Sequence, residues 1–398
     1  MTRPLENIRV LDLSRVLAGP WATQMLGDLG AEIVKVERPS SGDDTRSWGP
    51  PWYGDPKEQR SAYFMAANRN KSSVAIDMSV PEGADLIREL AKRSDVVVEN
   101  FKTGGLAQYG LDYASLAAIN PRLVYCSITG FGQDGPRAAQ PGYDLMIQAL
   151  SGLMSITGEP DREPQKVGVA LVDVMTGLHA VIAILAALHQ RASTGVGQYI
   201  DLALFDVAVS ALANQASNYL VSGTVPGRLG NAHPNIVPYQ VFDTADGQIV
   251  LAIGNDRQFA DFATIIGRPE WATDDRFRTN AARVANRSVM VEEIASVLRE
   301  YSTVHCVTIF GKAGLPHAPI NDIASALDDP QAIHRGLRMP ASIGFSVAGP
   351  LRFSGSTAEQ PRTPAKLGQH SKSVLRDVLD IDRDTIESLM QRRVIAVS

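Results

Sequence analysis

The stretch that decides the fold is residues 8–37, IRVLDLSRVLAGPWATQMLGDLGAEIVKVE. Residues 8–13 favour a strand, residues 21–29 favour a short helix, and Gly30 is a suitable residue to end that helix. Residues 31–37 alternate between polar and apolar side chains, which is typical of a second strand. A strand, a helix and a strand in this order predict the start of a parallel α/β sheet.

The same alternation continues to about residue 200. Further strands are expected at residues 73–77, 95–99, 123–129 and 168–172, and helices at 81–93, around 106–119 and at 175–191. This order predicts a Rossmann-like, mainly parallel sheet with helices on both faces.

The sequence changes character near residue 222, where a stretch rich in glycine and proline begins. Residues 239–243 and 248–253 flank Thr-Ala-Asp-Gly, which is a hairpin signal. We expect a large α/β domain over residues 1–222, a smaller α+β domain over 223–325, and a C-terminal segment, 326–398, that returns to the large domain.

Composition excludes several classes of protein. The 398 residues carry a net charge of -5, which gives no reason to expect nucleic acid as a partner. Cys126 and Cys306 lie far apart without metal-ligand spacing, which favours a reducing, cytoplasmic location and no bound metal. Neither the N-terminus nor the short apolar stretch at residues 178–188 predicts a signal peptide or a membrane span, and we expect residues 178–188 to form a buried core helix.

Asp173 is the most informative single residue. Mostly apolar residues precede it, and a long apolar helical pattern follows it. An aspartate there can cap the helix N-terminus. An ionised carboxylate in an apolar setting can also act as a nucleophile toward an activated acyl group. These two interpretations do not exclude each other.

Ligands of open parallel sheets bind outside the carboxyl ends of the strands. The groups expected there suit a ligand with phosphates, a planar ring and a reactive carbonyl; they are Ser14–Val16, Arg38, Asp77, Asn100, Phe101, Gly130–Gly132 and Asp173. Gly130, Gly132 and Gly135 match the spacing GxGxxG, but Pro136 and a loop-like sequence follow. A dinucleotide site needs a helix there, so a glycine loop beside the ligand is favoured.

The chain closely resembles the class III CoA-transferases of the CaiB/BaiF type. The segments that carry the resemblance include LDLSRVLAGPWATQMLGDLGAEIVKVERP, GDDTR, NRNK, DVVVENF, NPRLVYCSITGFGQDGP, PGYD, VDVMTG, HPNIVPYQVF and LGQH. The resemblance implies that CoA passes from an acyl-CoA to a carboxylic acid through an anhydride and then a CoA thioester on Asp173. It implies a CoA thioester as substrate, no permanently bound cofactor, and an interlocked homodimer.

The resemblance also assigns residues. It places Tyr143 and Asp144 beside the reacting acyl group and Gly254 and Asn255 in a loop over the site; the residues it assigns to CoA are Val16, Leu17, Ala18, Arg38, Asp77, Asn100 and Phe101. Leu17 and Gln108 depart from the formyl-CoA transferase branch, and GDDTRSWGPP resembles the succinyl-CoA:dicarboxylate branch. Arg15, Arg46 and Arg69 are candidates to bind the distal carboxylate of a dicarboxylic acid.

Two alternatives remain open. A 2-methylacyl-CoA racemase needs two acid/base groups, and racemases of this superfamily have Gly-His-Asp where this chain has Gly142, Tyr143 and Asp144. Tyrosine, with an ordinary pKa of about 10, replaces that histidine poorly. A non-catalytic CoA-binding homologue would bind acyl-CoA without turnover, and replacement of Asp173 would then change little.

Overall fold

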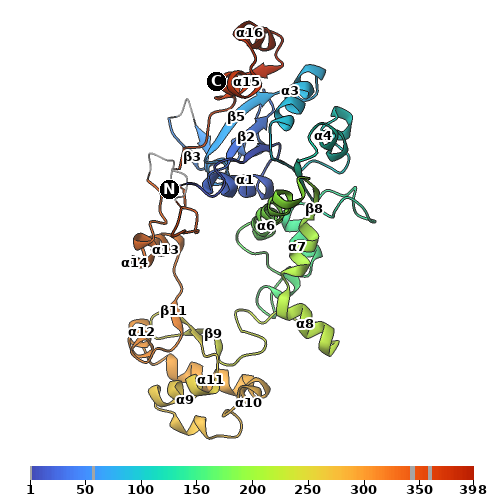
Figure 1. Cartoon of the computed structure of the whole chain (residues 1–398). Helices are drawn as coiled ribbons and strands as arrows, with labels where there is room; N and C mark the ends of the chain where they lie inside the picture. The colour runs from blue at the N-terminus through green and yellow to red at the C-terminus, as the bar shows by residue number, and fades with distance from the viewer. Residues whose placement is uncertain (1, 56–58, 341–345, 357–360) are drawn as a thin grey trace. The chain divides into compact units, whose positions relative to one another are not determined.

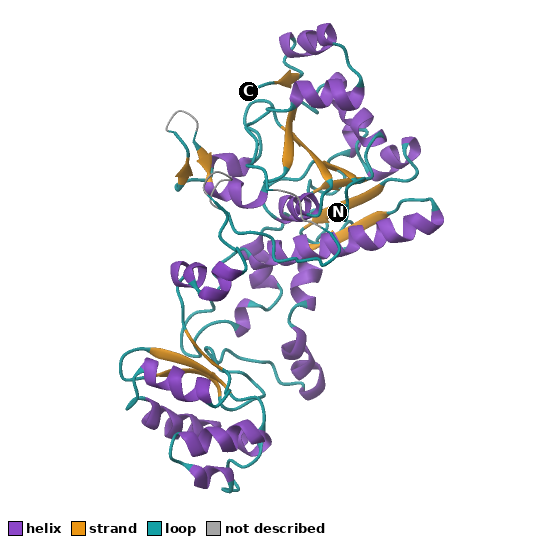
Figure 2. Cartoon of the chain, turned by 60° about the vertical axis from the view of Figure 1, so that its left-hand side comes forward, coloured by secondary structure: helices purple, strands orange, loops and turns teal. Residues whose placement is uncertain are grey.

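The computed structural model describes residues 2–55, 59–340, 346–356 and 361–398. A seven-stranded sheet organises most of the chain (Figures 1 and 2). Its strands, in spatial order, are β12 (Ile395–Ala396), β5 (Lys71–Ile76), β2 (Glu32–Glu37), β1 (Arg9–Asp12), β6 (Val96–Glu99), β7 (Val124–Thr129) and β8 (Tyr199–Ala203). Only β12 is antiparallel to its neighbour, so the predicted mainly parallel sheet is confirmed.

Helices cover both faces of this sheet. One face packs against α3 (Pro81–Lys92), α4 (Tyr113–Ile119), α15 (Ser371–Leu379) and α16 (Arg383–Gln391). The other packs against α1 (Ala18–Asp28), α5 (Asp144–Leu150), α6 (Leu171–Thr194) and α7 (Leu204–Ser210).

Neighbouring residues of each central strand point into opposite cores. Val10 of β1 packs with the α1 and α6 side, whereas Leu11 packs with the α3 and α15 side. Val10 pairs in register with Ile33, and Leu11 with Val34, so each pair lies in the same core. Because side chains alternate across a strand, two apolar faces require apolar runs rather than alternation.

The order in which successive strands are added to the sheet reverses between β1 and β6. Strands β2 and β5 lie on one side of β1, whereas β6, β7 and β8 follow one another on its other side. Such a switch point leaves a crevice at the carboxyl ends of the two central strands. Here the crevice lies between the residues that follow Asp12 and those that follow Glu99.

The chain divides into two compact units. The first contains residues 1–153, 166–217 and 331–398; the second contains residues 154–165 and 218–330. The second unit carries a three-stranded sheet of β9 (Tyr239–Asp243), β10 (Gln248–Ala252) and β11 (His317–Pro319), so the predicted hairpin is confirmed. Its helices are α9 (Asp256–Ile265), α10 (Asn280–Ala285), α11 (Arg287–Leu298), α12 (Thr303–Lys312) and α13 (Ile323–Asp328).

Residues 154–165 belong to the second unit although they precede the predicted boundary by more than fifty residues. Arg228 holds this segment in the second unit, because its guanidinium donates hydrogen bonds to the carbonyls of Glu159, Pro160 and Arg162. The remaining elements are β3 (Trp52–Tyr53), β4 (Arg60–Ser61), α2 (Ala62–Ala67), α8 (Ala213–Ser222), α14 (Pro330–His334) and the 3-10 turns Asp44–Ser47, Ala107–Tyr109, Met154–Ile156 and Pro269–Ala272.

Two expectations were wrong. Residues 168–172 form no strand: α6 begins at Leu171, and Val169 just before it is 59% exposed. The last parallel strand is β8, which was not among the predicted strands. The apolar stretch 178–188 is part of a 24-residue helix that is long and apolar enough, by length and composition alone, to cross a membrane. Only about two fifths of its most apolar window is buried, so α6 is not the fully buried core helix we expected.

Candidate active site

Asp173 lies in the first turn of α6. The N-cap is Ala170, so the interpretation of Asp173 as the capping residue is wrong. Instead, the carboxylate of Asp144 accepts hydrogen bonds from the amides of Val172, at 2.8 Å, and Asp173, at 3.3 Å. The orphan amides of the helix are therefore satisfied by another residue, and the Asp173 carboxylate has no hydrogen-bond partner among the contacts found in the described part of the chain.

The surroundings make the Asp173 carboxylate hard to ionise. Burial, and to a smaller extent the negative charge of nearby Asp144, raises its pKa to about 7. A carboxylate with a raised pKa and no counter-ion is typical of a functional site. It is also a stronger base than an ordinary aspartate.

Two glycines bring Asp144 to this position. Gly130 follows β7 and touches Gly142 backbone to backbone: a Cβ on Gly142 would lie 2.3 Å from the Cα of Gly130. Tyr143 and Asp144 follow directly and begin α5. Gln148, one turn further, donates to Asp144 at 2.6 Å and accepts from the amide of Val167, which fastens α5 to the chain that enters α6.

A cavity of about 240 Å³ opens in front of Asp173. It lies at the switch point of the sheet, between the loop after β1 and the loop after β6. Its walls include predicted residues from both loops and from the glycine segment; these are Val16, Leu17, Ala18, Asn100, Phe101, Gly130, Tyr143 and Asp173. The structure thus brings together residues that lie more than 150 positions apart in the sequence.

Helices α1 and α6 meet closely beside this cavity. A Cβ on Gly177, one turn after Asp173, would lie 2.8 Å from the carbonyl oxygen of Ala18. The N-terminal turn of α1 therefore sits against the N-terminal part of α6. Both helices direct their positive dipole ends toward the cavity that Ala18 and Asp173 line.

A second cavity, of about 450 Å³, lies beside the first. Arg38, Asp77, Phe101 and Gln108 line it, as do Lys102 and Arg15, which border both cavities. Asp77 accepts from the amide and hydroxyl of Ser79 at the edge of this cavity. The pair of cavities has room for an extended ligand with a reactive group at one end.

Some predicted residues lie elsewhere, and some cavity residues were missed. Gly254 and Asn255 belong to the second unit, where Asn255 caps α9 by accepting from the amide of Gln258. Lys102 and Asp44 line the cavity walls but were not predicted. Asp44 lies in the GDDTR segment, so the sequence did carry a signal for it.

The three candidate arginines differ in their contacts. Arg46 forms a two-pronged ion pair with Glu37, and Arg69 pairs with Asp28; both also donate to backbone carbonyls. Arg15 lies over the ring of Phe101, 5.0 Å from its centroid. Its Nη1 lies 3.3 Å from Asp44, and its buried Nε has no hydrogen-bond partner among the residues described.

In the described part of the chain, no group of three histidine, cysteine or acidic side chains is arranged to hold a metal ion. The fold and the cavities define a doubly wound α/β protein with an extended ligand cavity and a reactive carboxylate at the switch point.

Comparison with known proteins gives the family. The sequence profile of CoA-transferase family III matches residues 5–371. The chain is 49% identical to the succinate–glutarate CoA-transferase of Agrobacterium fabrum, over 96% of this chain and 97% of that protein. It is 43% identical to the human succinyl-CoA:glutarate CoA-transferase, over 99% and 90%. A crystal structure of a CaiB/BaiF family protein from Brucella suis superimposes with a TM-score of 0.85 at 48% identity, covering 95% of this chain and all of that one.

The chain belongs to CoA-transferase family III, and it is an enzyme of the CoA-transferase type.

Proposed function

We propose that this enzyme moves CoA from succinyl-CoA to a dicarboxylic acid, with glutarate as the first acceptor to test. The activities for which its relatives from Agrobacterium fabrum and human are named support this choice of substrates. The observation that carries the proposal is the Asp173 carboxylate, which has no counter-ion among the described residues and faces a cavity at the switch point of the sheet.

In the proposed reaction, the Asp173 carboxylate attacks the thioester carbonyl of succinyl-CoA. The C–S bond breaks, CoA leaves as a thiolate, and a succinyl-aspartyl anhydride forms. The thiolate then attacks the aspartyl carbonyl, which releases succinate and leaves CoA on Asp173 as a thioester. The acceptor carboxylate repeats the two steps in reverse order, so the acceptor leaves as its CoA thioester and the Asp173 carboxylate is regenerated.

We assign the larger cavity to the nucleotide end of CoA. Arg38 and Lys102 line it and can pair with phosphates, while Asp77 can accept from hydroxyl or amino groups. Phe101 and Arg15 border both cavities, so the pantetheine chain would pass them on its way to Asp173. Tyr143 would border the acyl group. Gly254 and Asn255 remain our proposed loop over the site.

We propose that two copies of the chain associate, as the interlocked dimer of the resemblance implies. The support is an apolar stripe on the outer face of α6, where Leu178, Ile182 and Ala186 are exposed at four-residue spacing. Helix α8 has no buried residue, and its Leu220 and Val221 are 79% and 89% exposed. Exposed apolar faces of this extent mark interaction surfaces.

The proposed location is the cytoplasm. Both cysteines are free and buried, which fits a reducing compartment.

The test is mass spectrometry of the protein after brief incubation with succinyl-CoA and acid quench. We expect a succinyl or CoA adduct on the peptide that contains Asp173, absent from Asp173→Ala. Asp384→Ala is the matched control, because Asp384 also lies in the first turn of a helix but is exposed and lines neither cavity.

Full transfer activity in Asp173→Ala would disprove the covalent mechanism. If no acyl-CoA gives an adduct, exchange of the α-proton of a 2-methylacyl-CoA in heavy water tests the racemase alternative. Binding of acyl-CoA with neither adduct nor exchange would identify a non-catalytic homologue.

A further inference from the structure

Side chains hold the backbone of the loop that joins β1 to α1 at three successive residues, 14 to 16. Asp12 accepts from the amide of Ser14 at 3.0 Å, and Lys35 donates to the Ser14 carbonyl at 2.8 Å. Asn100 bonds both the amide and the carbonyl of Arg15, at 2.8 and 2.7 Å. Asp43 accepts from the amide of Val16 at 3.3 Å. A surface loop would leave most of these groups to water.

Val16 needs such support. Its φ is +70°, in the left-handed region that branched side chains rarely adopt. This conformation costs free energy for a non-glycine residue, so it persists only when the surrounding structure enforces it. Such strained conformations cluster at functional sites, which suggests a function for the conformation of Val16. Val16 is followed at once by Leu17 and Ala18, which line the Asp173 cavity.

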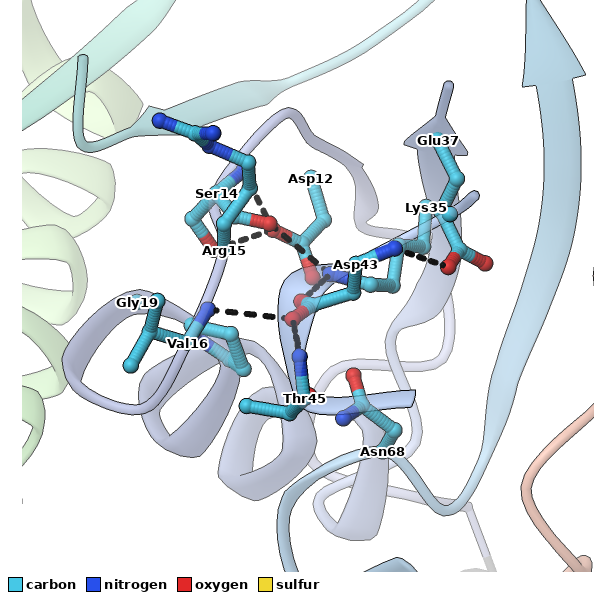
Figure 3. A network of polar contacts seen from close by, with 12 residues as sticks. Asp12, Ser14, Arg15, Val16, Gly19, Lys35, Glu37, Asp43, Thr45 and Asn68 are labelled. Carbon is cyan, nitrogen blue, oxygen red and sulfur yellow. Dashed lines mark hydrogen bonds and ion pairs between the residues drawn. The ribbon is translucent and has the colours of Figure 1, made fainter. Parts of the chain in front are cut away.

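The group that holds Val16 is part of a buried ion-pair network (Figure 3). Asp43 pairs with Lys35 at 3.0 Å, and neither side chain is more than 1% exposed. Asp12 pairs with Lys71, which is also buried. Burying such charges costs several kcal/mol each, and an apolar core would often serve stability as well. Their placement is therefore better explained by what they hold.

We propose that the buried Asp43–Lys35 pair is a positioning element of the transfer reaction: it holds Val16 in its left-handed conformation and thereby fixes the N-terminus of α1 beside Asp173. This inference rests on the proposed function. Asp43 acts through Val16, so it is a positioning residue rather than a catalytic one.

The N-terminus of α1 has the groups that the reaction needs. The first amides of a helix have no acceptor within it, and the dipole adds positive potential. Pro20 offers no N–H, so Ala18 and Gly19 supply the donors of the first turn. Charge develops on the thioester oxygen during attack, and correctly placed donors stabilise it. The helix packs tightly on the held loop, since a Cβ on Gly19 would lie 2.3 Å from the Cβ of Ser14.

A double-mutant cycle tests the proposal. Glycine adopts a φ of +70° without penalty, so Val16→Gly should make the loop less dependent on Asp43. We expect Asp43→Ala to lower kcat about a hundredfold in the native background. In the Val16→Gly background the same substitution should lower kcat less than about tenfold. Asp43→Asn, which keeps the side-chain volume and one acceptor, serves if Asp43→Ala does not fold.

Two further readouts separate positioning from stability. Asp28→Asn is the matched control: it breaks another largely buried ion pair, that with Arg69, without touching the loop. It should lower the melting temperature and keep kcat. Hydrogen exchange of residues 14–19 should accelerate in Asp43→Ala and slow again when Val16→Gly is added.

Equal losses of kcat from Asp43→Ala in both backgrounds would overturn the proposal, as would an equal loss of kcat in Asp28→Asn. The wild-type adduct with succinyl-CoA is measured first. Its absence would count against the proposed function, whereas its presence with an additive cycle would count against the positioning inference alone.

Discussion

The neighbours of Asp173 keep its carboxylate reactive because they do not stabilise its negative charge. Asp144 takes up the amides of Val172 and Asp173, which would otherwise bond or neutralise a carboxylate at that turn. It also adds a second negative charge nearby, which raises the pKa of Asp173. Asp144 thus shapes the site by removing stabilising partners from the nucleophile and by repelling its charge.

The raised pKa predicts a pH dependence. Only the ionised Asp173 can attack, and with a pKa of about 7 the ionised fraction increases about tenfold between pH 6 and pH 8. We expect kcat/KM for succinyl-CoA to rise accordingly with pH and to level off above pH 8. Asp144→Asn removes one of the two causes of the shift, so the midpoint should move to lower pH. Rates measured across this range for both proteins check it, and an unmoved midpoint would contradict it.

The same pKa predicts a stability effect. A carboxyl whose pKa is raised in the folded state binds more protons folded than unfolded between pH 4 and pH 7, so its contribution to stability is lost as the pH rises through that window. We expect Asp173→Asn to melt a few degrees above the wild type at pH 8 and close to it at pH 4. Scanning calorimetry at both pH values measures this difference. A constant difference would mean that the pKa is ordinary.

Arg15 is the arginine that we expect to bind the distal carboxylate of the acceptor. It borders the Asp173 cavity and keeps a buried Nε without a partner in the described chain, whereas Arg46 and Arg69 are engaged. Loss of a charged hydrogen bond costs about 1.5–3 kcal/mol, or roughly 10- to 100-fold. Arg15→Gln should raise the KM for glutarate by that factor and the KM for butyrate much less. An increase confined to the KM for succinyl-CoA would assign Arg15 to CoA instead.

At the scale of elements, the active-site geometry depends on two helices whose N-termini converge. Their distance is set by Gly177 of α6, which meets the carbonyl oxygen of Ala18 in α1. Alanine in a helix interior is normally more stable than glycine by about 1 kcal/mol. Overpacking against a fixed backbone costs about 1–3 kcal/mol and outweighs that gain.

Gly177→Ala is therefore expected to be destabilising and to lower kcat, because α1 must move away from Asp173. Gly311→Ala in α12 is the matched control: its Cβ would meet the ring of His317 at an ordinary 3.6 Å. That control should be neutral or stabilising in thermal melts and keep the wild-type kcat. If both variants behave alike, the close approach of α1 and α6 is not what fixes the site.

The sequence predicted elements best where side-chain pattern alone decides them. Residues 8–13 and 31–37 became β1 and β2, and the hairpin at residues 239–253 was confirmed. The predicted strand at 168–172 failed because a short apolar run fits a strand and a helix start equally well. Strand β8 was missed because its polar Asp201 interrupts the apolar run. The burial of Lys35 and Asp43 could not be predicted, because charged residues in a sequence are normally expected to be exposed to solvent.

At the scale of the whole molecule, the sequence predicted the parallel sheet but not how residues 154–165 join the second unit. That arrangement depends on hydrogen bonds from Arg228 to three backbone carbonyls. Every residue has a backbone carbonyl, so the sequence does not indicate which carbonyls accept these hydrogen bonds. The candidate site was largely predictable because parallel strands bring their carboxyl ends to one edge. The loop after β1 lies with the loop after β6 for that reason.

The outer face of α6 carries the last prediction. This 24-residue helix exposes Leu178 and Ile182, and apolar side chains in such a row are unusual on a surface that faces only water. We expect a second copy of the chain to cover them. The native protein should then have twice the chain mass of 42.8 kDa by light scattering. Ile182→Asp places a charge in that interface, where an unpaired buried carboxylate costs several kcal/mol, so the assembled dimer should melt at a clearly lower temperature than the wild type. Val304→Asp is the control: Val304 is 73% exposed in the second unit, outside the stripe. A monomeric wild type, or an Ile182→Asp variant that melts at the same temperature as Val304→Asp, would refute the α6 interface.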